Sequence, residues 1–211
     1  AKPYAVIFLP YLALRRRADS FFTLCAVLLL VLFLPGFQYG LQGNLHLLRG
    51  WSKSTFGTKI PNLTSQDSVS IFGMYSKWLG IGTGSFALAL VTTGVLATVF
   101  VIVFSKRSDR IFPEYLEMAL LLTLIPLFLP SGWDYTLLLS TTAIMCLINY
   151  FGDFSLRSKV VTGIALFAIG FSLYDVLGRS GYALFMSYSL ITICYFVVVA
   201  SLYRLRAAGA I

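Results

Sequence analysis

Long apolar runs separated by short polar stretches dominate this sequence. Roughly 20 consecutive apolar residues, each rising about 1.5 Å in a helix, are enough to cross the ~30 Å hydrocarbon core of a bilayer. The runs lack the alternation of apolar and polar residues that marks the strands of a membrane barrel. We therefore predict an all-α, multi-pass transmembrane protein with about six full spans. These lie at about residues 20–36, 84–104, 115–130, 133–151, 160–178 and 182–203.

The scarcity of charge supports this prediction. Of all residues, 58% are hydrophobic and only 11% are charged. In a soluble domain, about a quarter of all residues are charged. The formal net charge is +8, and the basic residues flank the apolar runs. This placement predicts membrane lipids as partners and argues against nucleic acid.

The sequence offers little for metal or cofactor binding. It contains one histidine, His46, so this chain alone cannot form a multi-histidine metal site, and we find no histidine-based triad in it. The three cysteines, Cys25, Cys146 and Cys194, lie inside apolar runs, and we interpret them as small buried hydrophobic residues. We predict no metal and no cofactor.

The first residues indicate an incomplete helix. Residues 3–14 are apolar but too short to span, and they follow Ala1 without the basic start of a signal peptide. We interpret them as a partial helix whose beginning is missing, and the chain as the back part of something longer. Residues 1–211 are predicted to form a single membrane domain.

Basic residues predict the orientation in the membrane, because cytoplasmic loops are enriched in Lys and Arg. If the helices alternate, ten basic residues fall on one side and six on the other. The richer side is predicted to be cytoplasmic, so the long loop 37–83 faces the extracytoplasmic space. The ten are Arg15, Arg16, Arg17, Lys106, Arg107, Arg110, Arg157, Lys159, Arg204 and Arg206; the six are Lys2, Arg49, Lys53, Lys59, Lys77 and Arg179.

The loop 37–83 is predicted to carry two amphipathic interfacial helices. Asn44 is expected to cap the first, and Ser65 the second, with Asp67 in its first turn. Apolar and aromatic side chains recur at helical spacing in both, as in helices that lie flat at a membrane surface. They are Leu45, Leu48 and Trp51 in the first helix, and Val69, Phe72, Tyr75 and Leu79 in the second.

Three acidic residues lie at predicted extracytoplasmic boundaries: Asp67, Asp134 and Asp175. A carboxylate in this position can bind a polar substrate or act as a base. Structural roles compete with these functions. Asp175 can pair with Arg179 four residues later, and Asp67 and Asp134 can favour helix N-termini. His46 can serve as a hydrogen-bonded interfacial residue.

Short motifs in sequence order resemble glycosyltransferase family 87, a family of bacterial multi-pass enzymes in the C-type superfamily. The resemblance covers essentially the whole chain and corresponds to the C-terminal half of a family member. The motifs are Lys2-Pro3-Tyr4 through Arg15-Arg16-Arg17, the loop with Trp51 and Asn62 through Gln66-Asp67-Ser68, and the turn Pro130-Ser131-Gly132-Trp133-Asp134-Tyr135.

The resemblance implies transfer of a sugar, often mannose, from a polyprenyl-phosphate donor to an acceptor outside the bacterial cytoplasmic (inner) membrane. An inverting transfer needs a carboxylate to deprotonate the acceptor hydroxyl, and the donor phosphate needs cations. We expect catalytic roles for Asp134, Asp67 and His46. We expect substrate-binding roles for Trp133, Gln66, Tyr135, Arg49, Lys77 and Arg179.

A non-catalytic structural or accessory subunit of a larger membrane complex is the alternative. Family members often carry His after the turn Trp, where this sequence has Asp134-Tyr135. Their catalytic acid usually lies in a first extracytoplasmic loop that precedes the region matched here. A transporter is less favoured, because the sequence has no inverted repeat and no charged residue near the middle of a span.

Overall fold

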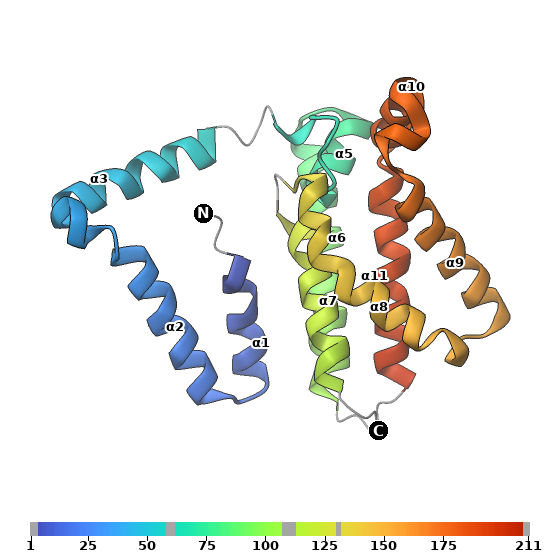
Figure 1. The fold of residues 1–211 in the computed structure, drawn as a ribbon, viewed down its shortest axis with the longest axis horizontal. Helices are drawn as coiled ribbons and strands as arrows, with labels where there is room; N and C mark the ends of the chain where they lie inside the picture. Colours follow the sequence, from blue (N-terminus) through green and yellow to red (C-terminus); the bar gives the residue numbers. More distant parts are fainter. Residues whose placement is uncertain (1–3, 58–61, 107–112, 130–131, 209–211) are drawn as a thin grey trace. The chain divides into compact units, whose positions relative to one another are not determined.

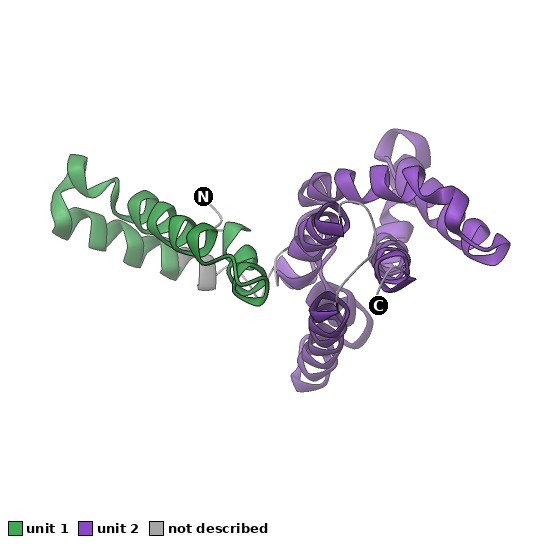
Figure 2. Ribbon diagram, turned by 90° about the horizontal axis from the view of Figure 1, so that it is seen from below, with its two compact units in different colours: residues 1–59 green, residues 60–211 purple. Residues whose placement is uncertain are grey.

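The computed structural model describes residues 4–57, 62–106, 113–129 and 132–208, and these are helical almost throughout. Within them, extended segments pair only at an isolated antiparallel bridge between Ser68 and Trp133. The all-α prediction is confirmed. The chain divides into two compact units, residues 1–59 and 60–211 (Figure 2). The single membrane domain stays a prediction.

The first unit is a short chain of helices that pack in sequence order. The turn η1 (Tyr4–Ile7) and α1 (Phe8–Leu14) lead into α2 (Ala18–Phe33) and α3 (Gly36–Gly57). Asn44 does not cap a helix as predicted, because it lies inside α3. Its buried side-chain amide instead donates to the carbonyl oxygen of Leu32 at 3.2 Å, which ties α3 to the end of α2.

The second unit is built around one buried helix, α7 (Pro113–Phe128) (Figure 1). Most of its side chains are buried, and α11 (Leu190–Ala208) packs along it. α11 also packs against α6, α8 and α9, so α7 and α11 together form the core of this unit. The other elements are α5 (Ile71–Leu79), α6 (Thr83–Ser105), η2 (Asp134–Ser140), α8 (Thr141–Asn149), η3 (Phe151–Asp153), α9 (Leu156–Phe171) and α10 (Tyr174–Ser187).

Two helices of the described residues, α6 and α11, are long and apolar enough to cross a membrane. Two bent pairs each form one further span if counted together: α2 with α3, bent by 85°, and α9 with α10, bent by 104°. The structure therefore supports a membrane protein with two to four candidate spans. The six full spans predicted from the sequence are not confirmed.

The helix boundaries explain part of this difference. The predicted span 160–178 is interrupted, because α9 ends at Phe171. The predicted span 182–203 begins too early, because residues up to Ser187 belong to α10 and α11 starts only at Leu190. The prediction for 84–104 agrees closely with α6. The turn residues Pro130 and Ser131 lie outside the described residues.

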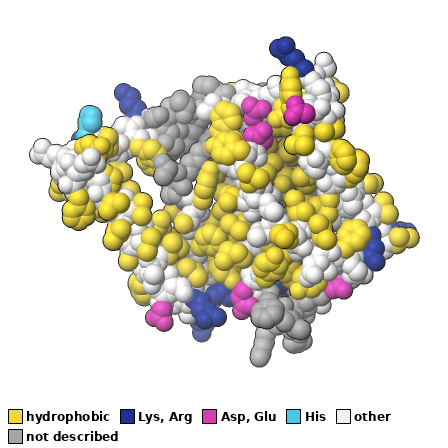
Figure 3. Space-filling view, viewed as in Figure 1, with side chains coloured by type: hydrophobic (Ala, Val, Ile, Leu, Met, Phe, Trp, Pro, Cys, Tyr) yellow, Lys and Arg dark blue, Asp and Glu magenta, His cyan; other side chains and the backbone are white. Residues whose placement is uncertain are grey.

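The surface has the character expected of a protein in contact with lipid. Apolar side chains cover most of the face seen in Figure 3, and charged side chains gather near its margins. Many large apolar residues of the helices are exposed, including Phe167 and Ile164 on α9 and Val91 on α6. A bilayer would cover such surfaces, since lipid tails are as apolar as these side chains.

A buried ion pair joins three helices at one end of the second unit. The Arg206 guanidinium on α11 donates from Nε to Glu117 Oε1 on α7 at 2.8 Å, and both side chains are fully buried. The Arg206 Nη2 atom donates to the carbonyl oxygen of Lys106 at 2.9 Å, directly after α6. The guanidinium also lies over the Phe104 ring, 5.7 Å from its centroid.

Replacing Glu117 with Gln should destabilise the protein by about 3–5 kcal/mol, because it leaves the Arg206 charge buried without its counter-ion. The free energy of unfolding in detergent micelles would measure this loss. Glu114→Gln is the matched control: Glu114 is exposed in the first turn of the same helix, so its change should stay under about 1 kcal/mol. Equal effects of the two substitutions would contradict the structural role of the ion pair.

Candidate active site

Two short extended segments bring two carboxylates to one place. The Val69 amide donates to the Gly132 carbonyl at 2.8 Å, and the Asp134 amide donates to the Asp67 carbonyl at 3.1 Å. This antiparallel pairing sets Asp67 beside Asp134 although 67 residues of sequence separate them. Both side chains are partly exposed.

The pairing requires a glycine at residue 132. A Cβ atom there would clash with the carbonyl oxygen of Pro126 near the end of α7. Without a side chain, the backbone after α7 can approach closely enough to accept the hydrogen bond from Val69. The local sequence therefore explains why the chain can turn back over α7 at this point.

The structural role predicted for Asp67 is wrong. α5 is capped by Ser70, whose Oγ accepts from the Gly73 amide at 2.9 Å, and not by Ser65. Asp67 thus lies before the cap, in the extended segment, and outside the first turn of α5. Asp134, by contrast, is the first residue of η2, and its Oδ1 accepts from the amide of Tyr135 at 2.7 Å.

One tyrosine hydroxyl connects the two carboxylates. Tyr182 on α10 donates toward Asp67 Oδ1 at 3.4 Å and toward Asp134 Oδ2 at 3.3 Å. A phenol has a single hydrogen, so it satisfies one carboxylate at a time. Both distances are long for O–H···O bonds, which leaves the carboxylate oxygens open to other partners.

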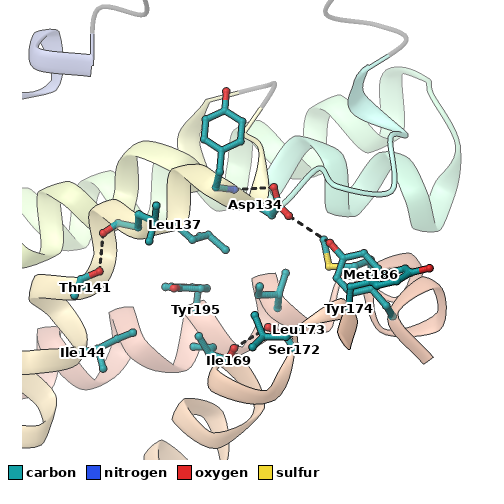
Figure 4. A pocket seen from close by; sticks show the side chains of 14 residues that line it. Asp134, Leu137, Thr141, Ile144, Ile169, Ser172, Leu173, Tyr174, Met186 and Tyr195 are labelled. Atoms are coloured by element: carbon teal, nitrogen blue, oxygen red, sulfur yellow. Dashed lines mark hydrogen bonds between the residues drawn. The ribbon is translucent and has the colours of Figure 1, made fainter. Parts of the chain in front are cut away.

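An apolar cavity of about 430 Å³ opens beside Asp134 and Tyr182. It lies between η2, α8, the α9–α10 corner and the start of α11. Figure 4 shows Asp134 at its edge, and most of the other labelled side chains are apolar or aromatic. Leu137, Ile144 and Leu173 are among them. Within the part of the chain that is described, no Lys or Arg lines this cavity. Asp134 thus lies at the edge of a mainly apolar cavity, and Asp67 is connected to it through Tyr182.

Lys77 joins the segment that carries Asp67 to the helix that carries Tyr182. Its ammonium donates to the carbonyl oxygens of Gln66 at 2.9 Å, Ser68 at 2.8 Å and Met186 at 2.9 Å. These bonds use all three donors of the ammonium and tie the Asp67 segment to the end of α10 that carries Tyr182. Burial lowers the pKa of Lys77 to about 8, an effect that the nearby Asp67 carboxylate opposes.

The remaining predicted residues of this unit lie around the pair. Trp133 forms the bridge with Ser68 through its backbone, and the exposed Tyr135 lines the apolar cavity. Gln66 is exposed and lines a second cavity of about 440 Å³, together with Lys77. The second unit thus places Asp67 and Asp134 side by side, with Gln66, Trp133 and Tyr135 next to them in sequence.

The remaining predicted site residues, His46, Arg49 and Arg179, are all exposed. His46 and Arg49 are exposed on α3 and belong to the first unit. Arg179 is exposed on α10. It does not form the predicted ion pair with Asp175 among the described residues, because Gly178, with φ of 65°, interrupts the helix between them.

Tyr182 is the residue that the sequence prediction missed. It lies at the start of the predicted span 182–203, where a tyrosine is usually an interfacial anchor. A signal was present in Gly178, at which α10 is interrupted, and in Gly181, because two nearby glycines indicate an irregular segment close to Asp175. The described residues also contain no group of three or more His, Cys, Asp or Glu side chains placed to hold a metal ion.

No protein-family model, curated protein or solved structure matches the chain. The assignment of the site therefore depends on its own geometry: two carboxylates, one bridging phenol, a clamping ammonium and an apolar cavity.

Replacing Lys77 with Met should destabilise the second unit by about 1–3 kcal/mol, because three backbone carbonyls lose their donor. Thermal unfolding in detergent, followed by tryptophan fluorescence, would measure the loss. Lys53→Met removes an exposed lysine of α3 and should leave the unfolding temperature unchanged. A stable Lys77→Met variant would show that the ammonium is not a structural clamp.

Proposed function

We propose that this chain is the membrane portion of a glycosyltransferase that moves a sugar, with mannose the first candidate, from a polyprenyl-phosphate donor to an acceptor hydroxyl. The observation that carries the proposal is the convergence of Asp67 and Asp134 around Tyr182 at the edge of an apolar cavity. This combination suits a substrate with a reactive polar head and a long hydrocarbon tail.

The chemistry assigned to the carboxylates is general base catalysis. One carboxylate takes the proton of the acceptor hydroxyl, whose oxygen attacks the anomeric carbon of the sugar. The bond between that carbon and the phosphate oxygen breaks, and polyprenyl phosphate leaves. Asp134 is the better candidate for the base, because it lines the cavity and Asp67 does not.

The surroundings support the binding of a lipid-linked donor. The cavity lining is mainly apolar, so it suits the first isoprene units of a lipid-linked donor. Arg179 lies on the same helix as Tyr182 and is exposed, so its guanidinium is free to bind the donor phosphate. Lys77 has no donor left for that task, because all three bind carbonyl oxygens.

The test is sugar transfer by membranes containing the Asp134→Asn variant. Asparagine keeps the size of the side chain but is not a base, so transfer from radiolabelled polyprenyl-phosphate mannose should fall by about 100-fold or more. Asp67→Asn should give a smaller loss. Asp175→Asn is the control, because Asp175 is an exposed acid on α10 that neither bonds Tyr182 nor lines the cavity. Unchanged transfer by Asp134→Asn would refute the assigned role.

We also propose that the chain crosses the bacterial cytoplasmic membrane six times, with the carboxylate pair on the extracytoplasmic side. The excess of basic residues at the opposite helix ends supports this orientation. Short helices such as α7 and η2 with α8 would cross where neighbouring helices satisfy their ends.

Labelling of single cysteines tests the orientation. In a variant without Cys25, Cys146 and Cys194, a cysteine at exposed Gln66 should react with a membrane-impermeant maleimide in intact cells. A cysteine at exposed Ser105, at the far end of α6, should react only after lysis. Labelling of both positions from the same side would contradict the proposed topology.

A non-catalytic subunit of a membrane complex is the second candidate. It is favoured by one observation, that the described lining of the cavity contains no cation for a phosphate. In this case the bridged carboxylates are structural, and Asp134→Asn would lower the yield of the assembled complex without affecting a transfer reaction.

A further inference from the structure

A second groove lies far along the chain from the carboxylate pair. It has a volume of about 340 Å³ and runs between the start of α9 and the end of α11. The apolar part of its lining, here called its floor, consists of Phe154, which is buried, with Val161, Val197 and Ala200. Thr162 and Ser201 also line the groove, and a buried hydrogen bond of 2.9 Å between them joins α9 to α11 at this point.

Two arginines stand at the polar end of this groove. Arg157 on α9 and Arg204 on α11 both line it, and both are exposed. Arg204 is oriented by a 2.8 Å hydrogen bond from its Nη1 atom to Ser158 Oγ, which leaves its other nitrogen atoms available. The described lining contains no acid; Asp153, four residues before Arg157, is the nearest acid in sequence.

We propose that this groove binds an anionic phospholipid. The headgroup phosphate is held by Arg157 and Arg204, and one acyl chain lies on the apolar floor between α9 and α11. Guanidinium groups bind phosphate oxygens through paired hydrogen bonds, and basic pockets between membrane helices suit anionic headgroups. The site is separate from the carboxylate pair, and its assignment does not depend on glycosyl transfer.

The shape of the surface favours a lipid over a soluble anion. The apolar wall continues beyond the groove along α9, where Val160, Ile164 and Phe167 are exposed. Figure 3 shows basic side chains at the right-hand edge of the view, where Figure 1 places the start of α9. A free phosphate would use only the arginines and leave this apolar path uncovered. A lipid occupies the arginines and the apolar surface at the same time. Its phosphate then lies at the predicted cytoplasmic boundary, where anionic lipids concentrate.

Native mass spectrometry of the detergent-solubilised chain tests the proposal. Dioleoyl phosphatidylglycerol, dioleoyl phosphatidylcholine and inorganic phosphate would be titrated separately. Phosphatidylglycerol should bind at least about tenfold more tightly than phosphatidylcholine, because only phosphatidylglycerol has a headgroup with a net negative charge. Inorganic phosphate at the same concentration should not displace it, because it cannot occupy the apolar floor.

Variants separate the two halves of the site. The double substitution Arg157→Gln and Arg204→Gln should abolish the preference for phosphatidylglycerol. Arg16→Gln with Arg17→Gln removes the same charge from an exposed turn of the first unit and should leave the preference intact. Val161→Trp keeps both arginines but fills the groove, so it should weaken phosphatidylglycerol binding. The unfolding temperature of each variant would show that it is folded.

Three results would overturn the proposal. They are equal binding of the two lipids by the unaltered chain, an unchanged preference in the Arg157 and Arg204 double variant, and displacement of phosphatidylglycerol by equimolar phosphate. The last would assign the arginines to a soluble anion.

Discussion

The arrangement of the second unit depends on one short backbone pairing, between residues 67–69 and 132–134. Two amide-to-carbonyl bonds, from Val69 to Gly132 and from Asp134 to Asp67, join the approach to α5 with the exit from α7. Thr192 of α11 adds a third contact, donating to the Val69 carbonyl at 3.0 Å. These three bonds satisfy backbone groups between the helices and connect the segments that lead into α5 and out of α7 to α11.

The sequence predicts the helical class and several helix bounds well, because long apolar runs carry this information locally. The prediction of 84–104 matches α6 within one residue at each end. The break between α10 and α11 was missed because it carries no Gly or Pro. Ser189 adopts a φ of 54° there, and the preceding Tyr188 carbonyl accepts from Trp78 Nε1 at 3.2 Å. Tertiary contacts, rather than local preference, hold this turn.

In the candidate site, too, the sequence predicts what depends on local information and misses what depends on tertiary contacts. Asp67 and Asp134 were predicted from their positions at membrane boundaries, which is local information. Their convergence requires the pairing of two distant segments, and no residue pattern in either segment announces it. A substrate-binding role for Lys77 was predicted from its charge alone; its three carbonyl partners come instead from the segment before α5 and from α10. A sequence shows which side chains are charged, but it does not show which groups they bind in the folded chain.

The long sequence separation within the site has a consequence for biogenesis. Tyr182 lies 115 residues after Asp67, and the ribosome releases the chain from its N-terminus. Both carboxylates therefore leave the ribosome before the phenol that bridges them and before the Met186 carbonyl that binds Lys77. Contacts of such high sequence separation form late, because a long loop must close first. The site is thus assembled only after α10 has been synthesised, and its integrity reports that the helices before α10 have already packed.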